Sequence, residues 1–424
     1  MCFFRKCFVF LCMFSLNTCN SFSVARLASD LGINANSTFY VNKVIDLKGD
    51  SLRLPQGVTL CFTSGCFKNG TLIGNNTKMI CSGVAFDQMT IKGSWQVTDI
   101  STKMFADLSH ENALTDVFAL ANPRVKNTIT IEKGDYIVKA NKNKDVCLAL
   151  CGNTDLILNG TIRMVPTTYP RYDIMKAKGH NIKIRGNGMI VGDKHTHLGT
   201  DGEWGMGLRF AGAVNASVSG LTIKNCWGDC IYVGGNSKNV LIERCLLDHG
   251  RRQGISVTKA DGVTIRNCKI SNVSGTNPQY AIDLEPNAND TVDHVLIENV
   301  EVVNCEGGLL ATKATRDTET KMIGDVQIKN CKVSAQSRYP IKMTSCESLT
   351  VENCIVTTRN EKSAIYTKNT RSVVVRNNVI NINKAILLSV KDTMKKAAGK
   401  KGFVPINIIQ AEKQDVRDNK IVEK

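Results

Sequence analysis

Hydrophobic residues recur along the chain in short bursts from about residue 219 to residue 380. In each burst, β-branched residues or leucines alternate with polar ones, and a charged residue, an Asn and often a Cys follow, as in residues 221–226 and 263–268. The fifth position of successive bursts is occupied by Asn225, Arg244, Asn267, Asn299, Asn330, Asn353 and Asn377. The intervals between them are 19, 23, 32, 31, 23 and 24 residues. A basic interval near 23 with irregular insertions is typical of a solenoid of short parallel strands.

A second short strand is expected after each burst. Apolar residues alternate again in residues 230–233, 254–257, 281–284, 308–311, 340–343 and 364–367. Two strands and a turn per repeat, each with one inward face, predict an all-β fold: a single-stranded, right-handed parallel β-helix. Such a fold stacks equivalent positions of successive coils into columns, so candidate chemistry can be sought column by column.

The flanking segments suggest four regions along the chain. Residues 1–20 are expected to be a signal peptide, residues 21–107 a strand-rich segment, residues 108–390 the β-helix, and residues 391–424 a cap and a basic tail. Residues 108–121 have the spacing of one amphipathic helix that Pro123 ends, and we expect this helix to cap the solenoid.

The first residues combine a basic start with a short apolar run, which is the pattern of an export signal rather than of a membrane span. The protein is therefore expected to be periplasmic, at the cell surface or extracellular. Residues 16–19 match a lipobox poorly, because Thr18 precedes Cys19. If the protein is attached to a membrane, we expect a lipid anchor at Cys19 to provide the attachment.

Seventeen cysteines in an exported chain raise the question of disulfides. Five of them follow the recurring fifth position directly, namely Cys226, Cys245, Cys268, Cys331 and Cys354. We expect these to stack as small buried hydrophobic residues. The local pairs Cys61/Cys66 and Cys147/Cys151 remain open as disulfides, and the spacing does not suggest zinc.

The formal net charge of +16 has two interpretations. One is a generally basic surface, and the other is attraction to an anionic substrate such as a uronate or sulfated polymer. Nucleic acid is not an expected partner, since the chain combines an export signal with no recognised nucleic-acid-binding motif.

Four segments interrupt the repeat with residues that a structural coil does not need. They are residues 192–207, 227–230, 248–254 and 281–287. Their candidate catalytic residues are Asp229, Asp283, Glu285, Arg252 and His249. Their candidate substrate-binding residues are Trp204, Glu203, Trp227, Arg251 and Gln253.

The column rule brings several of these residues together. Ile231, Ile255 and Ile282 are equivalent inward positions, so the residues that follow them should form one outward column: Tyr232, Ser256 and Asp283, with Arg209 before them and Lys342 after them. Arg209 and Lys342 are further candidate substrate-binding residues. Asp229 and Gln253 should share a neighbouring column. Carboxylates, cations and an indole on one face suit a sugar-binding subsite with acid–base chemistry.

The Gly-Asp-Tyr strand after the expected helix and the Asn-rich coils give residues 41–390 a resemblance to the pectate lyase-like superfamily. The resemblance implies the β-helix fold and a carbohydrate-active protein, but no single reaction. Residues 228–231 and 252–256 are also distantly similar to the polygalacturonase motifs Gly-Asp-Asp-Cys-Ile and Gly-His-Gly-Ile. This similarity implies a catalytic role for Asp229, whereas the His of the second motif is replaced here by Gln253.

Three functions follow as alternatives, each with a polysaccharide or oligosaccharide as partner. Asp229 and Asp283, two coils apart, should have backbones about 9–10 Å apart, which favours a glycoside hydrolase with water between acid and base. The resemblance to the superfamily implies that a lyase would use arginine or lysine as base, here Arg251, Arg252 or Lys342. Asp283, Glu285 and Asp290 would then hold calcium. A non-catalytic glycan-binding surface protein would keep the tryptophans and arginines alone. For the hydrolase no metal or other cofactor is expected.

Overall fold

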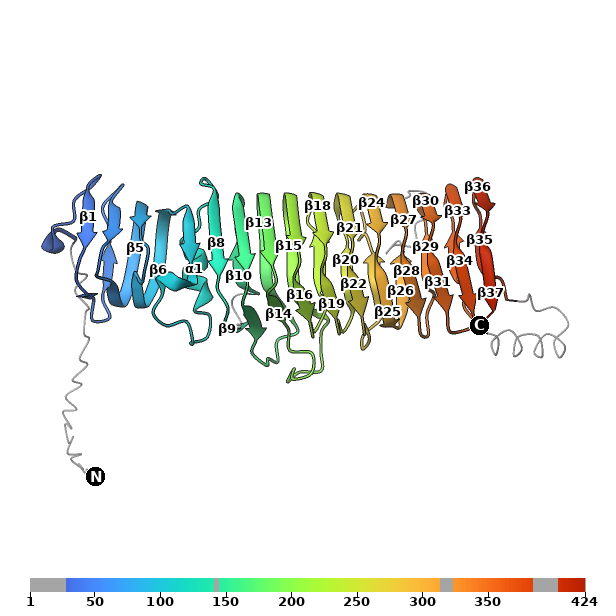
Figure 1. The fold of residues 1–424 in the computed structure, drawn as a ribbon, viewed down its shortest axis with the longest axis horizontal. Coiled ribbons are helices and arrows are strands. Elements are labelled where there is room, and N and C mark those ends of the chain that lie inside the picture. The colour runs from blue at the N-terminus through green and yellow to red at the C-terminus, as the bar shows by residue number, and fades with distance from the viewer. Residues whose placement is uncertain (1–27, 141–144, 313–322, 384–402, 424) are drawn as a thin grey trace, which may run out of the picture.

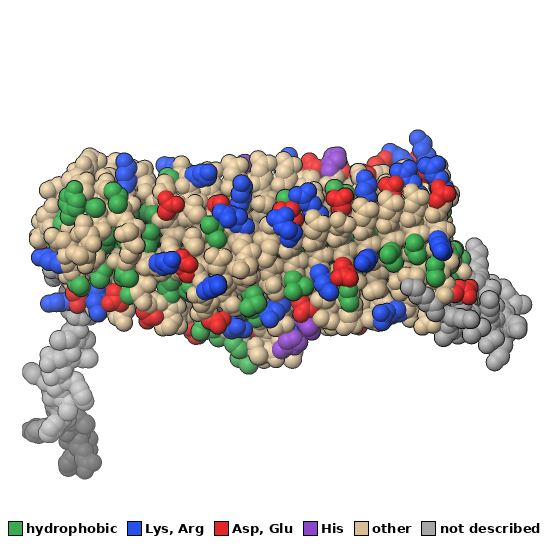
Figure 2. Space-filling view, viewed as in Figure 1, with side chains coloured by type: hydrophobic (Ala, Val, Ile, Leu, Met, Phe, Trp, Pro, Cys, Tyr) green, Lys and Arg blue, Asp and Glu red, His purple; other side chains and the backbone are tan. Residues whose placement is uncertain are grey.

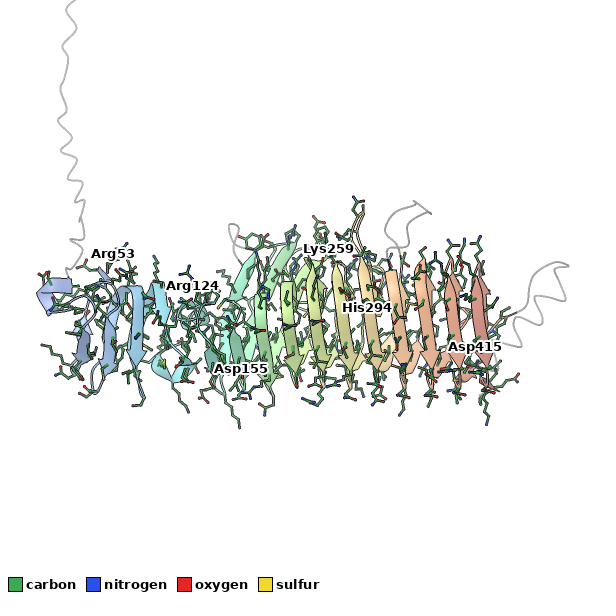
Figure 3. All side chains as sticks on the ribbon, turned by 90° about the horizontal axis from the view of Figure 1, so that it is seen from above. Arg53, Arg124, Asp155, Lys259, His294 and Asp415 are labelled. Carbon is green, nitrogen blue, oxygen red and sulfur yellow. The ribbon has the colours of Figure 1, made fainter. Side chains whose placement is uncertain are left out.

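The computed structural model describes residues 28–140, 145–312, 323–383 and 403–423, and it shows a long rod of stacked coils (Figure 1). The predicted signal peptide and Cys19 lie outside the described residues. Coloured from blue to red, the coils follow one another along the rod in chain order, and the view from above in Figure 3 shows the same elongated outline with side chains projecting on both sides. Each coil is therefore flanked only by its neighbours in sequence.

The strands pair in parallel in three sheets. The N-terminal sheet contains β1 (Thr38–Val41), β2 (Ile45–Asp46), β3 (Ser51–Arg53), β4 (Thr59–Phe62), β5 (Phe67–Ile80) and β6 (Phe86–Gln96). The eleven-stranded sheet contains β9 (Asp135–Val138), β12 (Thr161–Met164), β14 (Met189–Val191), β16 (Thr222–Lys224), β19 (Leu246–Asp248), β22 (Lys269–Ser271), β25 (Glu301–Cys305), β28 (Lys332–Ala335), β31 (Ile355–Thr358), β34 (Val379–Ile382) and β37 (Lys420–Glu423).

The largest sheet has twenty strands and, from residue 230 onward, carries both strands of each sequence repeat. It contains β7 (Asp99–Ser101), β8 (Asn127–Ile131), β10 (Val146–Leu150), β11 (Thr154–Leu158), β13 (Arg171–Gly186), β15 (Trp204–Ser219), β17 (Ile231–Gly234), β18 (Ser237–Glu243), β20 (Gln253–Val257), β21 (Ala260–Arg266), β23 (Tyr280–Leu284), β24 (Val292–Glu298), β26 (Gly307–Ala311), β27 (Ile323–Lys329), β29 (Ile341–Thr344), β30 (Cys346–Glu352), β32 (Ile365–Lys368), β33 (Ser372–Arg376), β35 (Ile406–Ile409) and β36 (Lys413–Arg417). The predicted all-β parallel β-helix is confirmed.

The recurring Asn of the sequence marks a sharp turn between two strands. Asn225 is the exception in position, because it lies at a second turn of its coil, in line with His249 and Asn272, and Gly220 is equivalent to Arg244. All seven residues at the fifth position have φ between 51° and 56°, in the left-handed region that Asn tolerates better than most residues. Arg244 adopts the same conformation at φ 51° and is the exception in residue type. The turn redirects the chain, and the next residue then points into the core.

The cysteines that follow these turns are buried, as predicted, with exposed fractions between 0% and 3%. Cys245, Cys268, Cys331 and Cys354 share one column, but Leu221 is opposite Cys245 and Cys226 lies further along its coil, so the prediction that Cys226 stacks with the others is wrong. Val300 and Asn378 take the equivalent place of this column in two other coils. Each of the five thiols contacts a backbone carbonyl two residues earlier, for example Cys331 Sγ to Lys329 O at 3.2 Å. All described cysteines are free thiols, including Cys61, Cys66, Cys147 and Cys151.

The predicted helix exists but is shorter and differently placed. It is α1 (Leu114–Ala119), with Leu114, Val117 and Phe118 buried. Strands β1 to β6 precede it and form coils of their own, so the prediction that it caps the end of the solenoid is wrong (Figure 1). It contacts β6 and β10, and its Asp116 Oδ1 accepts a hydrogen bond from Ile91 N of β6 at 2.7 Å.

Coils also extend beyond residue 390. Strands β35, β36 and β37 pair with β32, β33 and β34, so residues 406–423 add a further coil where only a cap and tail were expected. Elsewhere in the described residues, the helical turns are the 3-10 segments Ala28–Leu31 and Thr102–Met104. Among the described residues, no helix has the length and apolarity needed to cross a membrane.

Candidate functional site

The predicted outward column is present on the largest sheet. Tyr232 pairs with Ser256, and Ser256 pairs with Asp283. Arg209 precedes them opposite Tyr232, and Leu310 separates Asp283 from Lys342. The register of β17 and β20, extended by two residues, also places Asp229 opposite Gln253. The alternation of inward and outward residues was therefore sufficient to predict which side chains share this face.

Four carboxylates and Arg252 form what we call the carboxylate cluster: Glu203, Asp229, Asp283, Glu285 and Arg252. Arg252 Nη2 donates to Glu285 Oε2 at 2.6 Å. Its Nη1 lies 3.7 Å from Asp229 Oδ2 and its Nε lies 3.6 Å from Glu203 Oε2. One guanidinium thus makes one short and two longer ionic contacts, from a position that leaves only 11% of its side chain exposed.

Asp229 and Asp283 are almost completely enclosed, with exposed fractions of 0% and 1%. Ser256 Oγ donates to Asp229 Oδ2 at 2.7 Å, and Gln253 Nε2 donates to Asp283 Oδ2 at 2.6 Å. Within the described residues, Oδ1 of each aspartate has no hydrogen-bond partner. Buried polar atoms of this kind are costly and rare in folded proteins, so the pair calls for an explanation.

Burial also changes the protonation of both groups. It raises the pKa of Asp229 to about 6, against the opposing effects of Arg252 and Ser256. Burial, together with the charge of Glu285, raises the pKa of Asp283 well above its usual range. Burial alone would lower the pKa of Arg252, but the neighbouring carboxylates of Asp229 and Glu285 raise it above its usual value. The cluster therefore combines one carboxyl that retains its proton, that of Asp283, with a guanidinium that stays charged.

Gln253, predicted to bind substrate, instead positions Asp283. It is fully buried, and its Oε1 accepts a hydrogen bond from Tyr280 N at 2.9 Å while its amide donates to Asp283. Both ends of the side chain are used inside the protein. Ser256 and Tyr280 also hydrogen-bond within the cluster, although the sequence analysis did not select them as site residues. The column positions of Ser256 and Gln253 could have indicated that they contact the aspartates.

Trp227 cannot serve as the predicted sugar-stacking ring in this conformation. His197 stacks on one face, with ring centroids 3.7 Å apart and planes at 14°, and the Arg251 guanidinium lies 3.7 Å from the ring centroid. The indole is only 7% exposed. Arg251, also predicted to bind substrate, is held there by a 2.7 Å hydrogen bond from Nη1 to Gly202 O.

The segment from residue 192 to residue 204 is fixed to the coils by buried contacts. His197 Nδ1 lies 2.7 Å from Asp193 Oδ2, and the hydroxyl of Tyr172 donates to the other oxygen of Asp193. Lys194 Nζ donates to Ser274 O at 2.8 Å. This anchoring delivers Glu203 to the carboxylate cluster and leaves Trp204, at the start of β15, 48% exposed. Trp204 thus remains available for stacking.

His249, predicted to be catalytic, belongs to a different group of side chains. Its Nδ1 lies 2.7 Å from Asp248 Oδ2, and its ring meets His195 edge-on at 5.6 Å. Asp248 also accepts hydrogen bonds from Ser271 and Asn272. The prediction that His249 acts beside Asp229 is therefore not supported, because its partners lie at the end of β19 rather than in the cluster.

The two outer members of the column differ in their partners. Arg209 Nη1 lies 3.5 Å from Asp173 Oδ1, and its guanidinium lies 4.5 Å from the Tyr232 ring centroid. Lys342 Nζ lies 5.9 Å from the centroid of the Tyr339 ring. Both are half-buried and continue the charged face on either side of the cluster.

The residues considered as calcium ligands do not converge. Asp290 forms a 2.7 Å ion pair with Lys259, whereas Glu285 is bound to Arg252 and Asp283 to Gln253. Across the described part of the chain, no group of three or more His, Cys, Asp or Glu side chains is placed to hold a metal ion.

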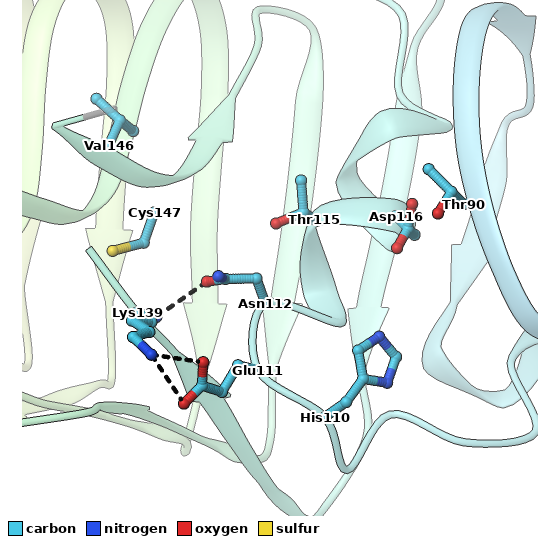
Figure 4. A pocket seen from close by; sticks show the side chains of 9 residues that line it. All are labelled: Thr90, His110, Glu111, Asn112, Thr115, Asp116, Lys139, Val146 and Cys147. Carbon is cyan, nitrogen blue, oxygen red and sulfur yellow. Dashed lines mark hydrogen bonds and ion pairs between the residues drawn. The ribbon is translucent and has the colours of Figure 1, made fainter. Parts of the chain in front are cut away.

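A hollow of about 300 Å³ lies elsewhere, beside α1 (Figure 4). Its polar groups are engaged with one another: Lys139 Nζ lies 3.1 Å from Glu111 Oε2, and the Lys139 backbone donates to Asn112 at 2.9 Å. It is lined by residues of earlier coils than the carboxylate cluster and contains no residue of that cluster.

The surface charge is spread rather than gathered. Lys and Arg side chains occur along the whole face seen in Figure 2, interleaved with Asp and Glu. The net charge of +16 therefore does not by itself mark one binding region on that face.

Known proteins resemble this chain in part. The uncharacterized protein YclG of Bacillus subtilis (strain 168) is 28% identical over 207 residues, which cover 42% of this chain and 35% of YclG. The SPbeta prophage-derived uncharacterized protein YorA of the same strain is 27% identical over 188 residues, 37% of this chain and 32% of YorA. The chain thus spans about a third of the length of these curated relatives.

Among solved structures, the A-module of the mannuronan C-5 epimerase AlgE6 from Azotobacter vinelandii superposes with a TM-score of 0.51. It is 12% identical and covers 77% of this chain and 99% of the module. This similarity shows a shared fold. The family model described as right handed beta helix region matches residues 171–321 and 276–398, which together make up more than half of the chain. The chain belongs to this right-handed β-helix family.

Proposed function

We propose that the protein is an exported glycoside hydrolase that cleaves a polysaccharide at the carboxylate cluster. The observation that carries the proposal is the pair Asp229 and Asp283, each buried and each with one unpartnered oxygen. A substrate hydroxyl, a glycosidic oxygen or a water molecule would supply the missing partners. Carboxyl groups with raised pKa values in a common cluster are typical of acid–base catalysis.

The two aspartates would have different roles. Asp283, whose pKa is raised well above the usual range, retains its proton and would protonate the leaving oxygen of the glycosidic bond. Asp229, with a pKa of about 6, is ionised near neutral pH and would take a proton from the attacking water. The two aspartates are two coils apart and three residues out of register along the strands, so their backbones are separated by more than the roughly 10 Å of two coil spacings, and an inverting reaction would place its water between the two side chains.

Arg252 would control access to the pair. Its contacts with Asp229 and Glu203, at 3.7 and 3.6 Å, are longer than hydrogen bonds, whereas its contact with Glu285 is short. Binding of a sugar hydroxyl to Asp229 would therefore break only the weaker contacts, while Glu285 keeps the guanidinium in place. Trp204, exposed at the rim, would stack on a sugar ring.

Elimination by a lyase is the second candidate, and the arginines argue against it. A base must lose its proton before it can act, but the carboxylates around Arg252 raise its pKa. Burial lowers the pKa of Arg251, yet its guanidinium is occupied by the Trp227 ring and Gly202 O. A lyase would therefore depend on Lys342.

The test compares the wild type with Asp283→Asn on neutral and uronic-acid polysaccharides. New reducing ends and the ultraviolet absorbance of an unsaturated uronate are followed together. We expect reducing ends without absorbance, and a loss of about 10²- to 10⁴-fold in the variant. Asp290→Asn, which changes a carboxylate paired with Lys259 outside the cluster, is the matched control. Absorbance that rises with the reducing ends would establish a lyase, and binding without either signal would establish a non-catalytic glycan-binding protein.

A further inference from the structure

A second group of side chains lies on the same face, C-terminal to the carboxylate cluster. We call it the tyrosine–lysine platform, and it consists of Tyr339, Lys342, Lys362 and Tyr366. Lys342 on β29 pairs with Tyr366 on β32, and the two tyrosine rings lie 5.1 Å apart. The Nζ atoms of Lys342 and Lys362 lie 5.9 and 5.7 Å from the Tyr339 ring centroid.

The platform is in line with the proposed reaction centre. Asp283 pairs with Leu310, and Leu310 pairs with Lys342, so the platform begins two coils further along the same column. Two coil spacings correspond to about 10 Å, more than the span of one pyranose ring. A sugar unit on the platform would therefore be separate from the unit whose bond is attacked.

The charges of the platform are not neutralised. Neither Lys342 nor Lys362 forms an ion pair with any described residue, although both lie beside aromatic rings. The N-terminal side of the column differs, because there Arg209 is bound by Asp173 and stacks on Tyr232, whose hydroxyl is 2.7 Å from Thr258 Oγ1. A cation beside an aromatic ring thus lies on either side of Asp283, and among the described residues only the cations of the C-terminal group lack an ion pair.

We infer that the tyrosine–lysine platform is a distal subsite for a negatively charged sugar unit of the same glycan. The inference rests on the proposed function and adds the substrate class and the direction in which the glycan extends. The tyrosine faces would contact the apolar face of the sugar ring, and the two ammonium groups would bind its carboxylate or sulfate. The neutralised cluster at Arg209 would not contribute in this way.

The inference is tested by electrophoresis of the full-length protein through gels that contain sodium alginate, sodium polygalacturonate or neutral dextran. We expect Lys342→Ala combined with Lys362→Ala to weaken binding to a charged polymer about five- to twentyfold at low salt, with a smaller difference at high salt. Tyr339→Ala should weaken the same binding severalfold. Lys103→Ala combined with Lys139→Ala removes the same net charge far from the platform and should have little effect.

Thermal unfolding of each variant, measured in parallel, separates lost binding from lost folding. Equal retardation of the wild type and the Lys342/Lys362 variant, or no retardation of the wild type by either charged polymer, would overturn the inference. Loss of retardation in the Lys342/Lys362 variant would support the distal subsite, whether or not the wild type releases reducing ends. A wild type that releases no reducing ends would reject the hydrolase proposal and leave the subsite unaffected.

Discussion

Asp229→Asn should stabilise the protein at neutral pH while abolishing its activity. The carboxylate of Asp229 has no exposed surface, and burial raises its pKa from 3.8 to about 6. The side chain of Asn has nearly the same shape, can still accept the hydrogen bond from Ser256, and carries no charge to bury. Functional sites often trade stability for chemistry in this way.

The size of the effect follows from the shift in pKa. A shift of one unit corresponds to 1.36 kcal/mol, so the change from 3.8 to about 6 amounts to about 3 kcal/mol. Because the folded-state pKa is raised, the native protein holds this proton more tightly than the unfolded chain does. The cost of the buried charge is therefore absent below about pH 4, grows between pH 4 and pH 6, and is complete above pH 6.

Urea denaturation at pH 4, 5, 6, 7 and 8 measures the difference between wild type and variant. We expect the variant to gain up to about 3 kcal/mol at pH 7 and pH 8 and almost nothing at pH 4. Asp201→Asn removes an exposed carboxylate of the same region and should change the free energy of unfolding little at any pH. A gain of equal size at pH 4 and pH 8, or a loss of stability at pH 8, would refute the reasoning.

Three further predictions follow from the same contacts. In the wild type, kcat/KM should rise with pH through about 6 as Asp229 ionises, and a flat profile in this range would remove Asp229 as the base. Arg252→Met leaves Glu285 and Asp229 without their cation, so urea denaturation should show a loss of about 3–5 kcal/mol at pH 7; an unchanged midpoint would contradict this. Replacing Asn330, at φ 55°, with Ala should lower the free energy of unfolding by about 1–2 kcal/mol, and replacing it with Gly should lower it less, because Gly adopts this conformation freely. Equal decreases in the two variants would show that another property of Asn is needed.

The sequence predicted the fold and the outward column because both depend on strict local rules. Alternation along a strand decides which side chains face outward, and the recurring Asn fixes where each coil turns, so the neighbours Ser256 and Asp283 could be assigned before any coordinates. The extra coil at residues 406–423 could not be predicted from the sequence, because an insertion separates it from the repeats and its strands lack the Asn–Cys signature.

The errors at the site arise from contacts between coils and the long loop. His197 covers Trp227 because residues 192–204 fold back onto a later coil, and no local pattern specifies that path. The role of Gln253 depends likewise on the backbone of Tyr280 in the next coil. Periodicity identifies the face on which a side chain lies, but whether it stays available to a ligand depends on what folds over it.

The stacking of coils separates the length of this protein from its chemistry. The carboxylate cluster uses only the coils that contain β15, β17, β20 and β23, and each coil pairs only with its neighbours. A duplicated coil nearer either end would lengthen the rod and a lost coil would shorten it, and neither would change the spacing of Asp229 and Asp283. Between the cluster and the platform, by contrast, one additional coil would move the two apart by about 4.8 Å, so natural variation in repeat number at that point would act as a ruler for the glycan.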